Sequence, residues 1–106
     1  MTHQKQMVKH IVKWNLKEEA LGQDKRTNAL QIREMLYGLI GVVREINFLE
    51  VVMDTSREEG GHDVVLYSVF DSMAALEAYK VHPAHKKVVD FVQNVVETRE
   101  VEDFEM

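Results

Sequence analysis

The chain has 106 residues, of which 45% are hydrophobic and 29% charged, a composition typical of one globular domain with its own core. It contains no cysteine, which excludes disulfides and thiolate metal sites. The formal net charge is -5 and no basic cluster offsets it, so nucleic acid is not expected as a partner, and no apolar run is long enough to predict a membrane span.

The first strand is predicted close to the amino terminus. Residues 1–6 are polar and are expected to form a flexible extension; they lack the apolar core of a signal peptide, so we expect a cytoplasmic protein. Residues 7–14 alternate in polarity, which predicts a strand with one strongly apolar face. That face carries Val8, His10, Val12 and Trp14. His10 is therefore either a hydrogen-bonded core histidine or part of a site.

A helix and two further strands are predicted in the middle of the chain. Asp24 is suited to cap a helix with regularly spaced apolar residues, and Gly38 and Gly41 mark the end of that helix. Residues 43–53 and 64–70 are predicted to be strands, joined by a polar loop over 54–63. Both strands carry apolar side chains on both faces.

The stretch 79–85 closes one helix, predicted over 73–81 with Asp71 or Ser72 as its cap, and opens another that runs to about residue 97. Pro83 suits the first position of a helix, which places His82 at the cap and His85 in the first turn. His85 then heads an apolar stripe at helical spacing, made of Val88, Val89, Val92, Val95 and Val96. Tyr79 stands on a similar stripe of the preceding helix. Tyr79 and His85 thus face the core, as two satisfied core residues or as a site.

A short, charged strand over 98–104 completes the chain and is expected near a sheet edge. The order strand, helix, strand, strand, helix, helix, strand predicts a ferredoxin-like α+β sandwich, an antiparallel sheet with helices on one face. Because the two middle strands are apolar on both faces, we expect a second copy of the chain to cover the face without helices.

The chain resembles the stress-responsive α/β-barrel domain family, also called Dabb, from residue 7 to about residue 105. The resemblance is carried by Met-Val-Lys-His-Ile-Val at 7–12, Gly-Leu-Ile at 38–40, Phe-Asp-Ser at 70–72, Leu-Glu-Ala-Tyr at 76–79 and, above all, His-Pro-Ala-His at 82–85. It implies one domain over 7–106 that forms a dimeric α/β barrel. One plant branch is similar to a polyketide cyclase that works without a cofactor, and its working residues match His10, Tyr79 and His85 here.

Two functions fit these residues. The first is a homodimer of unassigned activity with a small-molecule pocket between sheet and helices, in which Val12, Trp14 and His82 contact the ligand. The second is a cofactor-independent cyclase or lyase that acts on a polyketide-like or other small carbonyl substrate.

In the second function His85 would be the general base, Tyr79 would orient His85 or donate to a developing enolate, and His10 would hold the polar end of the substrate. No cofactor is expected. A metal site at His82 and His85 is disfavoured, because the pair has no carboxylate partner on the same face.

Overall fold

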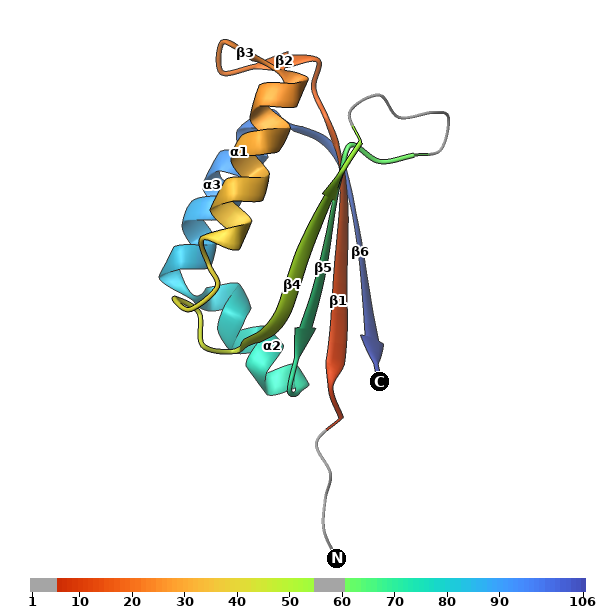
Figure 1. The fold of residues 1–106 in the computed structure, drawn as a ribbon, viewed down its shortest axis with the longest axis vertical. Coiled ribbons are helices and arrows are strands. Elements are labelled where there is room, and N and C mark those ends of the chain that lie inside the picture. Colours follow the sequence, from red (N-terminus) through yellow and green to blue (C-terminus); the bar gives the residue numbers. More distant parts are fainter. Residues whose placement is uncertain (1–5, 55–60) are drawn as a thin grey trace, which may run out of the picture.

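In the computed structural model, residues 6–54 and 61–106 are described, and they form a four-stranded antiparallel sheet with the three helices on one side of it and a separate two-stranded hairpin (Figure 1). The elements are β1 (Val8–Leu16), β2 (Glu19–Ala20), β3 (Gln23–Asp24), α1 (Lys25–Tyr37), β4 (Ile46–Met53), β5 (Val64–Phe70), α2 (Met73–Val81), α3 (Pro83–Val95) and β6 (Val96–Glu105). The sheet has the order β4-β5-β1-β6. This confirms the predicted ferredoxin-like α+β fold. Most of the predicted extension and part of the polar loop, residues 1–5 and 55–60, lie outside the described residues.

The predicted helix starts are borne out by their capping hydrogen bonds. The Asp24 carboxylate accepts the N–H of Thr27 at 2.8 Å at the start of α1. Of the two candidates before α2, Ser72 is the cap, because its hydroxyl accepts the N–H of Ala75 at 3.1 Å. Pro83 opens α3, where its missing N–H leaves no helical hydrogen bond unmade.

The observed elements differ from the prediction at several points. Strand β4 begins at Ile46 rather than at residue 43, since the Val43 N–H bonds the Leu39 carbonyl at 2.9 Å in the turn after α1. The loop before α1 contains the hairpin β2–β3, whose turn is allowed by the positive φ of Gly22, 73°. Helix α3 ends at Val95, because Val96 is extended and pairs with Leu16 in β1.

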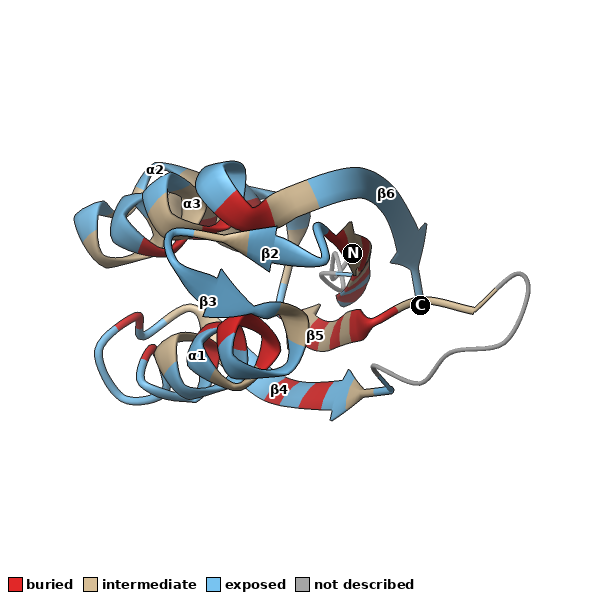
Figure 2. Cartoon of the chain, turned by 90° about the horizontal axis from the view of Figure 1, so that it is seen from above, coloured by how far each residue is buried: buried red, intermediate tan, exposed pale blue. Residues whose placement is uncertain are grey.

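The two faces of the sheet are in different environments. The side chains that face the helices are buried along β1, β4 and β5, and Figure 2 shows buried residues on β4 and β5. No helix among the described residues covers the opposite face, and Phe48 and Val52 on β4 keep 49% and 47% of their surface exposed. The sheet therefore has the second apolar face that the sequence predicts. No helix within 6–54 and 61–106 is long and apolar enough to cross a membrane.

Candidate functional site

A cavity of about 340 Å³ lies between the helix-facing side of the sheet and the helices. Its walls are mostly apolar, formed by side chains such as Val12, Leu66, Val88 and Val92. Polar side chains from four elements also reach it: His10 and Trp14 from β1, Tyr79 and Lys80 from α2, His85 and Gln93 from α3, and Arg99 from β6. Residues far apart in the chain thus meet at one apolar cavity with a few polar groups, which is the usual make-up of a small-molecule site.

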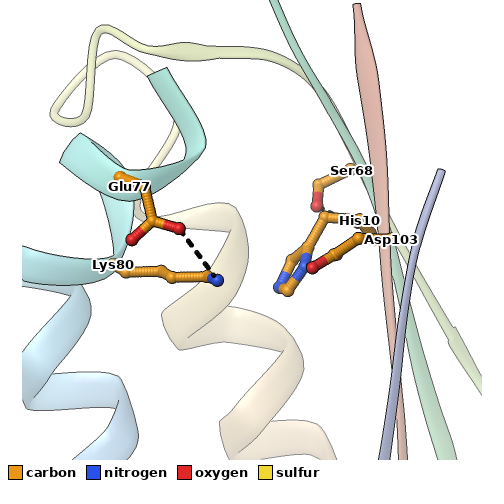
Figure 3. Close-up of polar contacts among 5 residues, drawn as sticks. All are labelled: His10, Ser68, Glu77, Lys80 and Asp103. Atoms are coloured by element: carbon orange, nitrogen blue, oxygen red, sulfur yellow. Dashed lines mark hydrogen bonds and ion pairs between the residues drawn. The ribbon is translucent and has the colours of Figure 1, made fainter. Parts of the chain in front are cut away.

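His10 is held in place by the neighbouring edge strand. Residues directly opposite in an antiparallel pair point to the same face, and His10 lies opposite Asp103 in the β1–β6 register. The Nδ1 atom of His10 is 2.5 Å from Oδ1 of Asp103, and Figure 3 shows that carboxylate beside the ring. A carboxylate accepts, so Nδ1 carries the proton and Nε2 is left free to accept one. The Ser68 hydroxyl also donates to the His10 carbonyl at 2.9 Å.

Tyr79 and His85 form an aromatic pair across the junction of α2 and α3. Their ring centroids are 4.2 Å apart, and the Tyr79 ring also packs on Phe70 at 4.9 Å. Nδ1 of His85 lies 3.2 Å from the Lys80 carbonyl oxygen, which can only accept, so this nitrogen donates. The second imidazole therefore also has Nε2 free as a proton acceptor.

Two hydrogen-bond donors in the cavity wall have no acceptor among the described residues. They are the hydroxyl of Tyr79, a residue 1% exposed, and Nε1 of Trp14, a residue 6% exposed. A buried donor without a partner costs about 1–3 kcal/mol, so native proteins seldom keep one without a use for it. A ligand oxygen acceptor beside either group would give that donor a hydrogen-bond partner.

Burial sets the protonation states of the site. It lowers the pKa of His10, although Asp103 acts in the opposite direction, and it lowers the pKa of His85, although the Lys80 carbonyl opposes that change. Burial also raises the pKa of the Tyr79 phenol. At neutral pH both imidazoles are therefore neutral bases and the phenol is a protonated donor.

These shifts predict a loss of stability in weak acid. In the unfolded chain both histidines titrate near the ordinary value of 6.5, whereas in the folded protein they bind protons only at lower pH. Between the two values the unfolded chain binds more protons, so the free energy of unfolding falls as pH drops below 6.5 and levels off beneath the folded-state pKa values.

Urea unfolding at fixed protein concentration, from about pH 8 to about pH 5, measures this effect above the range in which carboxylates titrate. We expect His10→Gln or His85→Gln to flatten the profile and His62→Gln, at a position outside the cavity lining, to leave it unchanged. A wild-type profile without this fall would contradict the assignment of two neutral buried imidazoles.

Five of the six site residues predicted from the sequence line this cavity: His10, Val12, Trp14, Tyr79 and His85. His82 is not among the lining residues. Its Nδ1 accepts the Ala84 N–H at 3.0 Å, so its ring caps α3. Within residues 6–54 and 61–106, no three His, Cys, Asp or Glu side chains are grouped so as to hold a metal ion.

The sequence did not point to three charged residues at the site: Lys80, Arg99 and Asp103. Period-2 alternation in the last strand places Arg99 and Asp103 on one face, and this signal was available. Asp103 could have been placed beside His10 only if the pairing of the last strand with the first, and its register, had been known. Nothing local in the sequence specifies that pairing.

The fold and the cavity can be compared with known proteins. The model of the family described as Dabb, Stress responsive A/B Barrel Domain, matches residues 8–106. The chain belongs to this family. None of the curated proteins matches this Dabb chain in sequence.

Solved structures similar to the Dabb chain share its fold along nearly its whole length. A dimeric protein of unknown function from Bacteroides fragilis is 26% identical with a TM-score of 0.83, and the match covers 98% of this chain and 100% of that one. A Dabb family protein from Mesorhizobium loti is 20% identical with a TM-score of 0.71, covering 96% and 98%. The hydroxynitrile lyase of Passiflora edulis is 19% identical with a TM-score of 0.76, covering 95% and 94%.

Proposed function

We propose that this Dabb protein, over residues 7–106, binds a small, largely apolar molecule that carries an oxygen acceptor, in the cavity between sheet and helices. The observation that carries the proposal is a pair of buried donors in a mostly apolar wall, the Tyr79 hydroxyl and the Trp14 indole N–H, which have no acceptor among the described residues. The cavity volume of about 340 Å³ falls in the range of ligand sites. A ligand oxygen would replace an unfavourable buried donor with a hydrogen bond.

Tyrosine substitution tests this proposal. In the ligand-free protein, Tyr79→Phe removes an unpaired buried hydroxyl, and we expect it to raise the free energy of unfolding by about 1 kcal/mol. The same change should weaken binding of methyl octanoate, an apolar ester with a carbonyl acceptor, by about tenfold. Trp14 is the only tryptophan in the sequence and lines the cavity, so its fluorescence reports binding.

Tyr37→Phe is the matched control, because the Tyr37 hydroxyl accepts the Val51 N–H at 3.0 Å outside the cavity. Removing this acceptor should lower the free energy of unfolding by about 1 kcal/mol and leave binding unchanged. If Tyr79→Phe destabilises the protein as Tyr37→Phe does, the Tyr79 hydroxyl has an internal structural role and the proposal loses its main support.

We further propose that two copies pack through the sheet face without helices to form the dimeric α/β barrel. Support comes from the exposed apolar side chains Phe48 and Val52 on that face. Structures similar to this chain are described as dimeric, among them those from Bacteroides fragilis and Thermobifida fusca. An antiparallel sheet facing water on this side would be expected to carry polar residues there instead.

A second candidate function is cofactor-independent acid–base catalysis on a small carbonyl compound, and the His10–Asp103 hydrogen bond favours it. Asp103 fixes the His10 tautomer and stabilises the imidazolium formed when Nε2 takes a proton. His85 offers a second neutral imidazole, the general base predicted from the sequence, and the Tyr79 hydroxyl can donate to a developing enolate oxygen. The fold hosts a lyase in Passiflora edulis, but at 19% identity that likeness speaks for the fold alone, so this candidate rests on the residues.

A further inference from the structure

The charge of the cavity wall differs in sign from that of the chain. The whole protein has a formal net charge of -5, yet the described residues that line the cavity include two cations, Lys80 and Arg99, and no carboxylate. A mostly apolar wall with buried donors and two cations, in an acidic protein, is suited to a negatively charged ligand with an apolar body.

The two cations, Lys80 and Arg99, differ in whether a carboxylate of the protein already pairs with them. The ammonium of Lys80 lies 3.4 Å from a Glu77 carboxylate oxygen, and Figure 3 shows this pair opposite the His10 ring. Arg99 makes no ion pair with any carboxylate in residues 6–54 and 61–106. Its guanidinium is a rigid set of donors that matches a carboxylate in two-point geometry. Arg99, an exposed residue, is therefore the lining cation that has no carboxylate partner among the described residues.

A second donor stands beside it. Arg99 lies directly opposite Trp14 in the β1–β6 register, so the two side chains share the helix-facing side of the sheet. Trp14 is the residue whose buried Nε1–H has no acceptor among the described residues. A neutral N–H and a guanidinium on neighbouring strands can together bind the two oxygens of one carboxylate.

Arg99 and the His10 imidazole mark two ends of the cavity that are separated along β1, and Lys80 lies at the His10 end (Figure 3). His10 and Trp14 lie on the same face, and with about 3.3 Å of rise per strand residue their Cα atoms are about 13 Å apart. Apolar side chains such as Val12, Val88 and Val92 line the space between. A ligand that reaches both ends has an apolar body of several carbons with one charged terminus.

We propose that the natural ligand is an amphipathic monocarboxylate, with its carboxylate on Arg99 and the Trp14 indole N–H and its apolar body extending along β1 toward His10. This identifies the ligand class of the site under the proposed function and rests on it. The positive charge of Arg99 also acts on both imidazoles of the site, adding to the larger effect of burial in lowering their pKa values.

Ligands matched in length but not in charge test the proposal. Octanoate, methyl octanoate and octylamine have the same apolar body and a negative, neutral or positive head group. We expect wild-type protein to bind octanoate at least about tenfold more tightly than methyl octanoate, because charge-assisted hydrogen bonds are about twice as strong as neutral ones, and to bind octylamine most weakly. Calorimetry and Trp14 fluorescence both measure these affinities.

Substitutions of two arginines test whether Arg99 causes the preference for octanoate over methyl octanoate. Arg99→Gln should remove the preference for octanoate and leave methyl octanoate binding within about twofold, and Arg99→Lys should keep part of the preference. Arg33→Gln, at an exposed position of α1 outside the cavity lining, is the matched control and should behave as wild type. Raising the salt concentration from about 20 mM to about 500 mM should weaken octanoate binding more than ester binding.

The outcomes separate this inference from the proposed function. Equal affinity for acid and ester in the wild type, or an unchanged preference in Arg99→Gln, would overturn the carboxylate assignment and leave a neutral-ligand site standing. Failure of both octanoate and methyl octanoate to bind would overturn the carboxylate assignment and the proposed function together.

Discussion

Phe48→Glu is expected to convert the proposed dimer into a monomer. Phe48 lies on β4, opposite Val69 in the β4–β5 register, on the sheet face without helices, and 49% of its surface is exposed in the single chain. By two-fold symmetry the change would place two carboxylates in an apolar interface at once. Burying an unpaired charge is strongly unfavourable, so we expect the dimer dissociation constant to rise at least about 100-fold. Sedimentation equilibrium at micromolar concentration measures this directly.

Ile40→Glu is the matched control for that experiment. Ile40 is also an apolar residue and is 53% exposed, but it lies in the turn between α1 and β4 rather than on the sheet. Its substitution should leave the dimer intact. A wild-type protein that sediments as a monomer, or a Phe48→Glu variant that remains dimeric, would rule out association through this face.

The second large effect is expected on the rate of proton transfer to and from a bound ketone. If the site is catalytic, His10→Gln should reduce the rate of α-proton exchange on a bound ketone by about 10²–10⁴-fold, the contribution typical of a positioned acid–base group. Asp103→Asn should have a similar effect while His10 itself is retained, because an amide can stabilise the wrong tautomer and cannot stabilise the imidazolium. Deuterium uptake by 2-octanone in D₂O, followed by NMR, measures the reaction without a product assay.

Comparison with other histidine variants locates the base. His85→Gln tests the role that the sequence predicts for His85, whereas His62→Gln changes a histidine that pairs with Glu100 outside the cavity lining and should leave the rate unchanged. A rate lost only in His85→Gln would assign the base to α3 rather than β1. Deuterium uptake no faster than without protein would remove the catalytic candidate, and ligand binding by the same cavity would remain.

Much of the fold follows from local signals in the sequence. Alternation over residues 7–14 identifies the strand face that bears His10, because side chains of a strand point to opposite sides in turn. Asp24, Ser72 and Pro83 mark helix starts. The side chains of Asp24 and Ser72 each accept a backbone N–H of the first helical turn, and Pro83 has no N–H that would need an acceptor there. Apolar residues on both faces of the middle strands indicate that the sheet has two apolar faces. All of these signals act within a few residues.

Where local signals conflict with chain geometry, the prediction was wrong by a few residues. Val43 is apolar and in phase with β4, yet it is buried in the turn because its N–H bonds back to Leu39. Val96 continues the stripe of α3 at helical spacing, yet it pairs with Leu16 and begins β6. In both places apolar periodicity continues across the end of an element, because the core accepts an apolar side chain from either conformation.

The pairing of polar and charged groups at the site was decided by the tertiary structure. His10 and Asp103 are 93 positions apart, and only the β1–β6 register brings their side chains within hydrogen-bond distance. The same register places Arg99 opposite Trp14 and so sets a free cation beside an unpartnered donor. A one-residue slip would send every side chain of β6 to the other face. Register depends on the packing of the whole sheet, and no short stretch of sequence encodes it.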